Sequence, residues 1–283
     1  MKIIVIGGVA GGASFAARLR RLNESAQITI FERGEFVSFA NCGLPYHISG
    51  AIPDREDLIL KTPSDFKNAY NIEVKTGHEV IFINKDKKTV QVKELCSGKI
   101  LEESYDKLLL SPGARAYTPP MDGYKEDLVH TLKTIPDMDK IISLIEKNKV
   151  NHAVVIGGGF IGLEVAENLA EKGIKTELIE FADQVMIAFD KEMANILHNE
   201  ITANGIQLHL ENSVKAIEEL PHNKIKVTLN NGKIIETGLI VSAVGVRPES
   251  DLAKVSGLKL NEKGAIIVNQ NMQSSDPNIY AAG

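Results

Sequence analysis

The sequence predicts an α/β protein with two doubly wound parallel sheets, because one pattern of strand, glycine turn, helix and second strand occurs twice. The first copy comprises Ile3–Gly12 and Ile28–Glu32, and the second comprises Ala153–Gly162 and Thr176–Glu180. The apolar runs lack polar alternation, which is typical of parallel strands covered on both faces. Apolar residues at helical spacing follow each turn: Ala16, Leu19 and Leu22, then Val165, Leu169 and Ala170. Each copy is therefore expected to be a βαβ unit.

The first glycine turn reads Gly7-Gly8-Val9-Ala10-Gly11-Gly12. A backbone that bends tightly here can bring its N–H groups, at the positive end of the next helix, against a pyrophosphate. Val9 stands where the usual fingerprint has its middle glycine, so its side chain is expected to point away from the phosphates. Glu32 lies about 20 residues beyond Gly12, where a carboxylate can accept hydrogen bonds from ribose hydroxyls. This turn is therefore expected to bind a dinucleotide.

The second turn satisfies the full fingerprint, Gly157-x-Gly159-x-x-Gly162. A strand precedes it, a helix follows it, and Glu180 stands at the end of the next strand, which together make a dinucleotide site a specific prediction. A carboxylate at Glu180 would bond the ribose 2′-hydroxyl of NADH and repel the extra phosphate of NADPH. We expect a preference for NADH, although a nearby Lys or Arg would still permit NADPH.

Two further regions have strand and turn signals. Residues 74–83 and 89–95 are expected to be β-rich, and residues 224–229 and 233–236 alternate like the strands of a hairpin. The second pair is expected to complete a small α/β domain.

The composition favours a globular chain over other classes. The 283 residues are enough for two domains, and 32 basic residues against 37 acidic ones give no basic field for a nucleic-acid partner. No apolar run reaches the roughly 18 residues of a membrane span. The two cysteines, Cys42 and Cys96, are too few for a disulfide framework or a zinc cluster. We expect a cytoplasmic protein with no membrane, nucleic-acid or metal partner.

Several segments carry a family resemblance. Ser38–Tyr46, which reads Ser-Phe-Ala-Asn-Cys-Gly-Leu-Pro-Tyr, resembles the active-site signature of the coenzyme A-disulfide reductase and coenzyme A-persulfide reductase branch of the FAD-dependent pyridine nucleotide-disulfide oxidoreductases. Leu108–Ala114 resembles the strand and turn at which the family's chain leaves the first part of its FAD domain. Gly245–Pro248 resembles the return from the NAD domain, and Ser274–Gly283 resembles the second FAD motif. The matches extend from Lys2 to Gly283.

The resemblance implies that a Rossmann-like NAD domain is inserted in a Rossmann-like FAD domain. The expected boundaries are 1–116 for the first part of the FAD domain, 117–242 for the NAD(H) domain and 243–283 for the second part of the FAD domain. In the family an aspartate for the flavin's ribityl chain and a C-terminal dimerisation domain follow the last motif. The chain therefore looks like an N-terminal portion of a protein that forms a homodimer at full length.

Cys42 is the expected catalytic residue. It stands at the expected start of a short helix, where unpaired N–H groups favour a thiolate, and the resemblance places it beside the flavin. The fifth residue after it is His47 rather than a second cysteine, so Cys42 is expected to act alone. The implied reaction passes electrons from NADH to FAD and then to a mixed disulfide or persulfide between Cys42 and a small thiol such as coenzyme A. His47 could supply a proton, but nothing in the sequence identifies a base.

Coenzyme A is anionic, and the resemblance places its contacts near the helix after Gly12. Arg21, Ser38 and Asn41 match the family pattern, whereas Ser14 and Arg18 match in position only. Arg18 could equally belong to a solvated basic face.

The resemblance also assigns residues to the two nucleotides, including Phe160 as a nicotinamide gate and Glu164 near the flavin, although Phe160 could be core. The expected cofactor-binding residues are Gly7, Gly8, Val9, Ala10, Gly11, Gly12, Glu32, Arg33, Val80, Ser111, Gly113, Gly157, Gly159, Phe160, Ile161, Gly162, Glu164, Glu180, Gly245 and Gly283.

Two alternatives remain open. One is an NADH oxidase or peroxidase in which Cys42 cycles through sulfenic acid, although the peroxidase branch has a histidine where this chain has Ala10. The other is a fragment that binds nucleotide or a partner without turnover. The sequence also leaves open which disulfide, persulfide or polysulfide is the substrate, and whether a sulfurtransferase domain follows.

Overall fold

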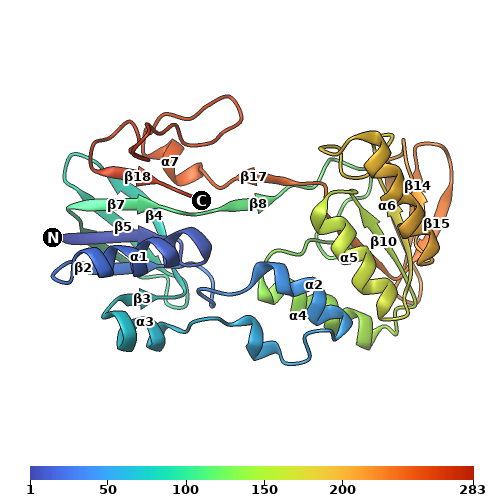
Figure 1. The fold of residues 1–283 in the computed structure, drawn as a ribbon, viewed down its shortest axis with the longest axis horizontal. Coiled ribbons are helices and arrows are strands. Elements are labelled where there is room, and N and C mark those ends of the chain that lie inside the picture. The colour runs from blue at the N-terminus through green and yellow to red at the C-terminus, as the bar shows by residue number, and fades with distance from the viewer. The chain divides into compact units, whose positions relative to one another are not determined.

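A computed structural model describes residues 1–283, which form two compact units. Unit 1 comprises residues 1–40, 59–115 and 247–283, and unit 2 comprises residues 41–58 and 116–246. Each unit is built on a five-stranded parallel sheet, which confirms the predicted fold class (Figure 1). Strands β8 (Ala114–Ala116) and β17 (Val246–Pro248) pair where the chain passes from one unit to the other.

The parallel sheet of unit 1 has the strand order β18-β7-β1-β2-β3. Its strands are β1 (Lys2–Ile6), β2 (Gln27–Phe31), β3 (Glu73–Lys75), β7 (Lys107–Leu110) and β18 (Ile279–Ala281). The central strand β1 pairs with β2 from Lys2 opposite Gln27 and with β7 from Ile3 opposite Lys107. Strands from the two ends of the chain therefore share one sheet.

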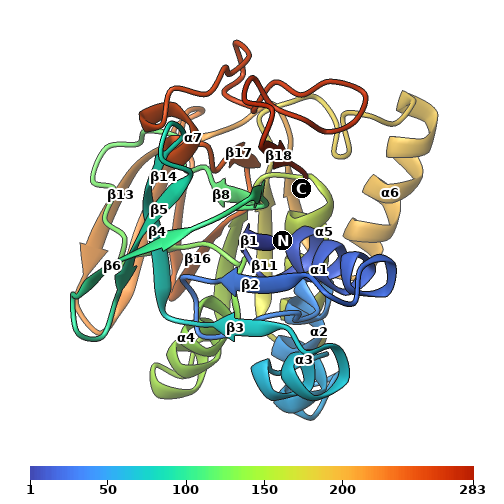
Figure 2. The same ribbon diagram turned by 90° about the vertical axis from the view of Figure 1, so that its left-hand side faces the viewer.

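Both faces of this sheet are buried, as the unbroken apolar runs predict. Ile3 and Val5 pack in a core with helices α1 (Ala10–Leu22) and α3 (Pro63–Tyr70), whereas Ile4 and Ile6 pack in a second core on the other face. That second core includes residues of strands β4 (His78–Asn84) and β5 (Thr89–Glu94), which form an antiparallel sheet with β6 (Ile100–Ser104), and of helix α7 (Asp251–Val255). Figure 2 shows β4–β6 and α1 on opposite sides of the parallel sheet.

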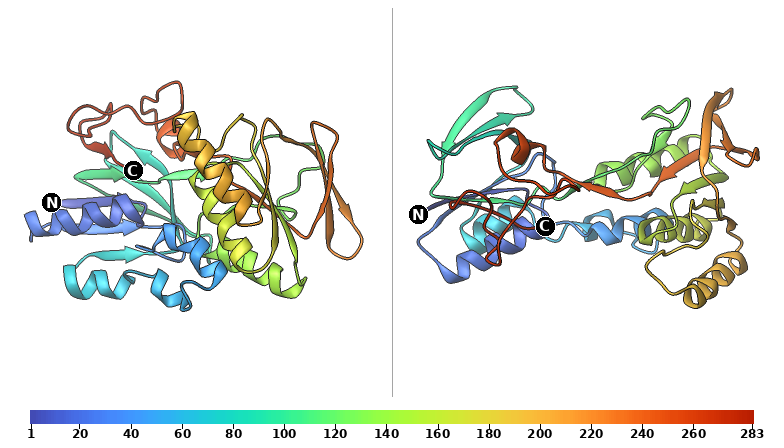
Figure 3. Two further views of the ribbon diagram at one scale, coloured as in Figure 1. Left: turned by 45° about the vertical axis from the view of Figure 1, so that its right-hand side comes forward. Right: turned by 90° about the horizontal axis from the view of Figure 1, so that it is seen from above.

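The parallel sheet of unit 2 has the order β12-β11-β10-β16-β9. Its strands are β9 (Val129–His130), β10 (His152–Ile156), β11 (Lys175–Ile179), β12 (Gln207–His209) and β16 (Leu239–Ser242). Helices α5 (Phe160–Glu171) and α6 (Lys191–Ala203) adjoin it, with α5 contacting β10 and β11 and α6 contacting β12 (Figure 3). An antiparallel sheet of β13 (Val214–Leu220), β14 (Lys224–Leu229) and β15 (Ile234–Thr237) shares a core with Val154 and Ile156.

A buried carboxylate ties the antiparallel sheet of unit 2 to its parallel sheet. Glu177 on β11 is 3% exposed and accepts hydrogen bonds from His209 Nε2 at 2.6 Å and from Lys233 Nζ at 3.1 Å. Burial opposes ionisation, but the hydrogen bonds from His209 and Lys233 outweigh it and lower the pKa of Glu177. The charged form of Glu177 therefore holds the turn before β15 against the sheet.

Residues 41–58 pack in unit 2, whereas the predicted boundaries include them in the first domain. They form a 3-10 turn at Asn41–Gly43, helix α2 (Leu44–Ser49) and a second 3-10 turn at Arg55–Leu58. Helix α2 contacts α5 and α4 (Ile135–Lys147), and Arg55 forms a forked pair with Asp139 of α4 at 2.8–3.2 Å. These long-range contacts explain the difference at this segment. No helix of the structure is long and apolar enough to cross a membrane.

Two sequence-based expectations about the smaller sheets can be compared with the structure. The hairpin expected at residues 224–229 and 233–236 is confirmed as β14 and β15, but the third strand β13 was not predicted. The β-rich stretch 74–83 is divided between two sheets, since β3 ends at Lys75 and β4 begins at His78. Gly77 permits this division because its φ is +66°.

Candidate dinucleotide sites and the cysteine segment

The second glycine turn joins β10 to α5 in unit 2. Gly157 has a φ of +106°, which side-chain-bearing residues rarely adopt. A Cβ on Gly162 would lie 1.8 Å from the carbonyl oxygen of Gly157, so the helix packs directly on the turn. A Cβ on Gly159 would meet nothing within 4 Å. The backbone is therefore open at Gly159, where a pyrophosphate is expected to approach.

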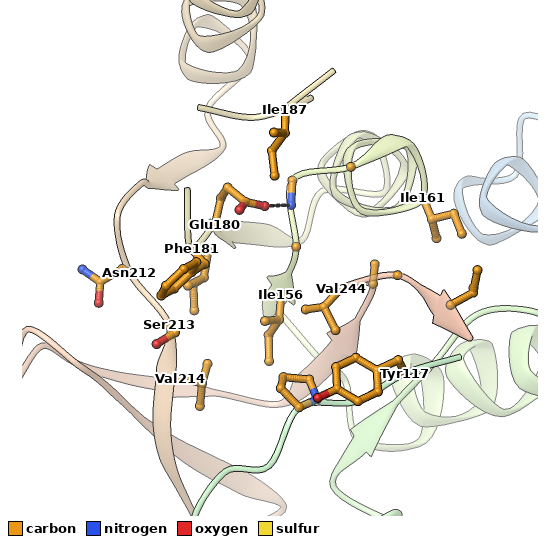
Figure 4. Close-up of a pocket in the computed structure, with 18 of the residues that line it drawn as sticks. Tyr117, Ile156, Ile161, Glu180, Phe181, Ile187, Asn212, Ser213, Val214 and Val244 are labelled. Atoms are coloured by element: carbon orange, nitrogen blue, oxygen red, sulfur yellow. Dashed lines mark hydrogen bonds between the residues drawn. The ribbon is translucent and has the colours of Figure 1, made fainter. Parts of the chain in front are cut away.

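Glu180 holds this turn from the end of the neighbouring strand β11. Its carboxylate is 8% exposed and accepts a hydrogen bond from the main-chain N–H of Gly158 at 2.5 Å (Figure 4). It also accepts a hydrogen bond from the N–H of Ala182 at 2.8 Å. The sequence indicated only a role toward ribose. In the structure Glu180 also fixes the backbone of the turn.

A cavity of about 760 Å³ opens at the carboxyl ends of β10, β11 and β16. In a doubly wound sheet this edge is where nucleotides bind. Glu180 is the only charged side chain in its lining, which also includes Tyr117, Pro119, Pro120, Met121, Phe160, Ile161, Phe181, Met186, Ile187, Asn212, Ser213 and Gly245. Thus no positively charged side chain lines the cavity.

Phe160 and Ile161 are exposed at the start of α5, 67% and 41% respectively, which contradicts the core alternative for Phe160. The Phe160 ring meets that of Phe189 edge-on, with centroids 6.4 Å apart. Glu164 is half-buried one turn further along α5. Burial, and then the charge of Glu167, raises the pKa of Glu164.

The first glycine turn, in unit 1, has the same frame. Gly7 has a φ of +95°, and a Cβ on Gly12 would lie 1.8 Å from its carbonyl oxygen. Glu32 accepts hydrogen bonds from the main-chain N–H groups of Gly8 at 2.8 Å and Gly34 at 2.7 Å. Both turns therefore use a carboxylate from the end of the second strand as an internal brace.

A cavity of about 360 Å³ lies beside this turn. Its lining is more charged than that of the cavity in unit 2 and includes Glu32, Arg33, Glu79, Val80, Glu249 and Asp251. Arg33 lies 3.1 Å from Glu249 and 3.9 Å from Glu79, and Arg115 lies 3.3 Å from Glu249. The expected FAD residues Glu32, Arg33 and Val80 therefore line one pocket, and Arg33 belongs to an ion-pair network there.

Three other expected FAD residues come together although they are far apart in sequence. A Cβ on Gly11 would lie 2.5 Å from Ser111 Oγ and 3.6 Å from the Cα of Gly283, and a Cβ on Gly283 would lie 3.0 Å from Ser111 Oγ. Gly113 has a φ of +70°, and its carbonyl accepts a hydrogen bond from the N–H of Glu249. Gly245 in unit 2 has a φ of +117° and accepts from Tyr117 N–H in the same way.

Cys42 is an exposed free thiol in the 3-10 turn that leads into α2. The expected position at the start of a short helix therefore matches the structure. Helix α2 packs on α5, and Ser49 Oγ donates to Oδ1 of the buried Asn168 at 2.6 Å. Burial, followed by the charges of Glu164, Glu167 and Cys42, raises the pKa of Tyr46. The cysteine segment thus adjoins the helix that begins at the second glycine turn.

The other candidate groups near Cys42 in sequence have plainer environments. His47 Nδ1 lies 2.7 Å from the carbonyl oxygen of Ile52, a contact that gives this ring a local structural role. Cys96 is exposed in the turn between β5 and β6 of unit 1.

The expected coenzyme A residues are divided between the two units. Ser14, Arg18 and Arg21 are exposed along one face of α1 in unit 1, whereas the adjacent Arg20 bonds the carbonyls of Tyr70 and Asn71. Ser38 is half-buried in unit 1 and has a φ of +46°. Asn41 is exposed in unit 2 and donates to the carbonyl of Lys133 at 3.3 Å.

No sequence pattern indicated two segments that line the cavity of unit 2. One is the loop after Glu180, which contributes Phe181, Met186 and Ile187, and the other begins at Tyr117. Neither has a motif or a helical or strand period. The position of the loop directly after the acidic strand end was the one signal that could have indicated it.

Comparison with known proteins agrees with this geometry. The family model of the pyridine nucleotide-disulphide oxidoreductases matches residues 1–283. The chain belongs to this family. The predicted family is therefore confirmed, and members of this family are FAD-dependent oxidoreductases that use NAD(P)H.

Three relatives share the whole length of this pyridine nucleotide-disulphide oxidoreductase chain. A coenzyme A disulfide reductase of Staphylococcus aureus is 40% identical over 282 residues, which are 100% of this chain and 63% of the relative. A crystal structure described as reduced Bacillus anthracis CoADR-RHD is 46% identical with a TM-score of 0.96, over 100% of this chain and 50% of that one. A NAD-dependent persulfide reductase from A. fulgidus is 36% identical with a TM-score of 0.95, over 100% and 53%. The chain thus spans less than two thirds of each relative.

Proposed function

We propose that the chain is the nucleotide-binding part of an FAD-dependent NADH oxidoreductase that reduces coenzyme A disulfide, coenzyme A persulfide or polysulfide through Cys42. The observation that carries the proposal is the setting of this thiol. Cys42 is exposed, it precedes a helix that packs on α5, and α5 begins at a glycine turn with the geometry of a dinucleotide site. The same unit thus combines a candidate thiol with a nucleotide turn.

The residues of each unit fit one of the two nucleotides of the family. In unit 1, Gly11, Ser111 and Gly283 leave no room for side chains around the turn, and Glu32, Arg33 and Val80 line the adjoining cavity, which favours FAD there. In unit 2, the open backbone at Gly159 and the cavity beside Glu180 favour NADH. Bound FAD would supply the two-electron transfer between NADH and sulfur. The assignment of FAD and NAD(H) parts to 1–116, 117–242 and 243–283 is part of this proposal, with residues 41–58 of the first part packed in unit 2.

A preference for NADH over NADPH follows from the charges of the cavity in unit 2. Its one charged lining residue is the carboxylate of Glu180, which would repel a 2′-phosphate. Neither Lys nor Arg lines the cavity to compensate for that repulsion. The ratio of kcat/KM for the two nucleotides measures the preference, and a ratio that favoured NADPH would contradict it.

The chemistry proposed for Cys42 conserves atoms and electrons. The Cys42 thiolate attacks one sulfur of a coenzyme A disulfide, forming a mixed disulfide and releasing one coenzyme A thiolate. Two electrons, supplied in turn by NADH, cleave the mixed disulfide, regenerate the Cys42 thiolate and release the second coenzyme A thiol after protonation. With a coenzyme A persulfide, attack on the outer sulfur forms a Cys42 persulfide and releases the coenzyme A thiolate, and the same two electrons then cleave the Cys42 persulfide to the Cys42 thiolate and hydrosulfide.

The names of the relatives support coenzyme A as the thiol carrier, and the exposed face of α1 is compatible with it. Arg18 and Arg21 there offer guanidinium groups to phosphates, with Ser14 on the same face. Ser38 and Asn41 are the other proposed contacts. The homodimer expected at full length is part of the proposal as well.

The test compares the wild type, Cys42→Ser and Cys96→Ser, each incubated with FAD and then titrated anaerobically with NADH. We expect wild type and Cys96→Ser to bind FAD and to oxidise NADH with coenzyme A disulfide. Cys42→Ser should bind both nucleotides yet lose the disulfide-dependent turnover. Full turnover by Cys42→Ser would overturn the role of the thiol, and a colourless wild type would favour a chain that binds nucleotide without catalysis.

The same assay separates the oxidase alternative. In that case NADH oxidation would require oxygen, would proceed without a disulfide and would produce water or peroxide. Ala10 occupies the position of the first glycine turn at which the peroxidase branch of the family carries a histidine. We therefore expect oxidase or peroxidase activity to be minor.

A further inference from the structure

The loop between β11 and α6, residues 180–190, forms one side of the cavity in unit 2. Phe181 and Ile187 in this loop are 78% and 71% exposed and stand at the rim around Glu180 (Figure 4). Val185, between them in sequence, is fully buried. The loop therefore has an anchored centre and exposed apolar flanks.

The anchored centre lies directly against the glycine turn. A Cβ on Gly158 would be 2.9 Å from Val185 Cγ1, and the N–H of Met186 donates to the carbonyl of Gly158 at 2.9 Å. Met186 has a φ of +49°, a conformation that a residue with a side chain keeps only when its surroundings hold it there. The position of Val185 thus sets the position of the loop relative to the nucleotide turn.

A histidine also contacts the main chain of Val185. The main-chain N–H of Val185 donates to Nε2 of His198 on α6 at 3.1 Å. A main-chain N–H can only donate, so Nε2 must have a free lone pair and the imidazole must be neutral, with its proton on Nδ1. The loop conformation in the structure therefore requires uncharged His198.

We infer that His198 is a positioning residue for NADH, which holds the loop 180–190 against the glycine turn through Val185. This inference rests on the proposed function of the cavity. Protonated His198 would direct an N–H at the N–H of Val185, which removes the bond and releases the loop. NADH affinity should then fall as the pH decreases.

The segment from Glu180 to His198 carries the charged residues Glu180, Asp183, Asp190, Lys191 and Glu192. Lys191 at the start of α6 pairs with Asp183 of the loop at 2.6 Å, and its hydrogen bond and charge lower the pKa of Asp183. Glu211 in turn acts on Lys191, and Glu180 braces the turn beside Val185. None of these groups replaces Nε2 as the acceptor for Val185 N–H.

The experiment measures the dissociation constant of NADH by calorimetry for the wild type, His198→Leu and His198→Gln at pH 8 and pH 5.5. Leucine removes the acceptor, whereas the glutamine Oε1 can replace Nε2 and does not titrate. At pH 8 we expect binding to His198→Leu to be about tenfold weaker than to wild type and binding to His198→Gln to be nearly normal. The wild-type constant should rise several-fold at pH 5.5, and that of His198→Gln should rise less.

His222→Asn is the matched control, because His222 lies exposed in the turn between β13 and β14, with a φ of +62° that asparagine tolerates. It should bind NADH like wild type at both values of pH. If His198→Leu bound NADH as tightly as wild type, or if His198→Gln had the same pH dependence as wild type, the inference about His198 would be overturned and the proposed function would stand. A wild type that bound no NADH at pH 8 would overturn the proposed function and the inference with it.

Discussion

The two glycine turns have the same internal frame but face different surroundings. In each turn, a Cβ added to the last glycine would lie 1.8 Å from the carbonyl oxygen of the first glycine. In each turn a glutamate also accepts hydrogen bonds from two main-chain N–H groups. Beyond the frame they diverge. Arg33 and its ion pairs follow Glu32, whereas the exposed Phe181 follows Glu180. The frame is therefore common to both units, and the residue after the acid distinguishes their cavities.

The largest expected effect comes from breaking the frame. Gly12→Ala and Gly162→Ala each place a Cβ against main-chain atoms that cannot move without shifting the strand, so we expect about 3 kcal/mol or more of destabilisation. Urea unfolding would measure the loss in free energy of unfolding, and hydrogen exchange of the native protein would show whether unit 1 or unit 2 is destabilised. Gly159→Ala is the control, since its Cβ meets nothing, and should cost less than about 0.5 kcal/mol. Equal effects at Gly159 and Gly162 would contradict the packing argument.

The second prediction removes the charge of each brace. Glu32→Gln and Glu180→Gln retain one carbonyl oxygen but face the second main-chain N–H with an amide donor. Losing a charge-assisted bond to a buried N–H should destabilise each unit by about 2 kcal/mol. Glu180 should show the larger loss because it is buried while Glu32 is half-buried. Thermal unfolding with hydrogen exchange would measure the difference, and a larger loss for Glu32→Gln would be the contrary result.

How far the sequence predicted these features depends on the range of the interactions. The turns, the sheets around them and the acids at Glu32 and Glu180 follow from local patterns of glycine and apolar residues. The bracing bonds to Gly8 and Gly158 could not be predicted, because the spacing of an acid from a turn does not show which N–H groups its carboxylate reaches.

The packing of residues 41–58 in unit 2 also lay outside local signals. It depends on contacts such as Ser49 with Asn168 and Arg55 with Asp139, which join segments about a hundred residues apart. The same reason applies to His198, whose partner Val185 lies in a loop without periodicity. A sequence pattern specifies an element well but a side-chain pairing between elements poorly.

A third prediction distinguishes the two units by their response to pH, because His130 is the only buried histidine and lies in unit 2. Burial, with a smaller contribution from Lys140, lowers the pKa of His130 to about 4. In the unfolded chain His130 binds a proton below about pH 6.5, whereas in the folded protein it stays neutral until about pH 4. Unit 2 therefore loses stability as the pH falls from 6.5 toward 4. The loss should be about 1 kcal/mol between pH 7.5 and pH 5.5.

Hydrogen exchange of unit 2 at the two values of pH would measure this loss, with His130→Phe as the variant that cannot titrate. We expect the variant to lose about 1 kcal/mol less than wild type over the same range. Unit 1 has no buried histidine and serves as an internal control. An identical pH response of unit 2 in both proteins would show that other groups dominate its titration.

The smallest expected change in stability concerns the one glycine position of the fingerprint that differs between the two turns, Val9 in the first and Gly159 in the second. Gly159 has a φ of −82° and a ψ of −175°, an extended conformation that any residue can adopt, and the space around it is open. Gly159→Val should therefore alter stability by less than about 0.5 kcal/mol. NADH binding should nevertheless weaken by about tenfold or more, because the valine would stand where the pyrophosphate approaches the backbone. Val9→Gly is the converse: if the side chain of Val9 points away from the phosphates, FAD binding should be unchanged, whereas tighter FAD binding would mean that Val9 and Gly159 meet their nucleotides in the same way.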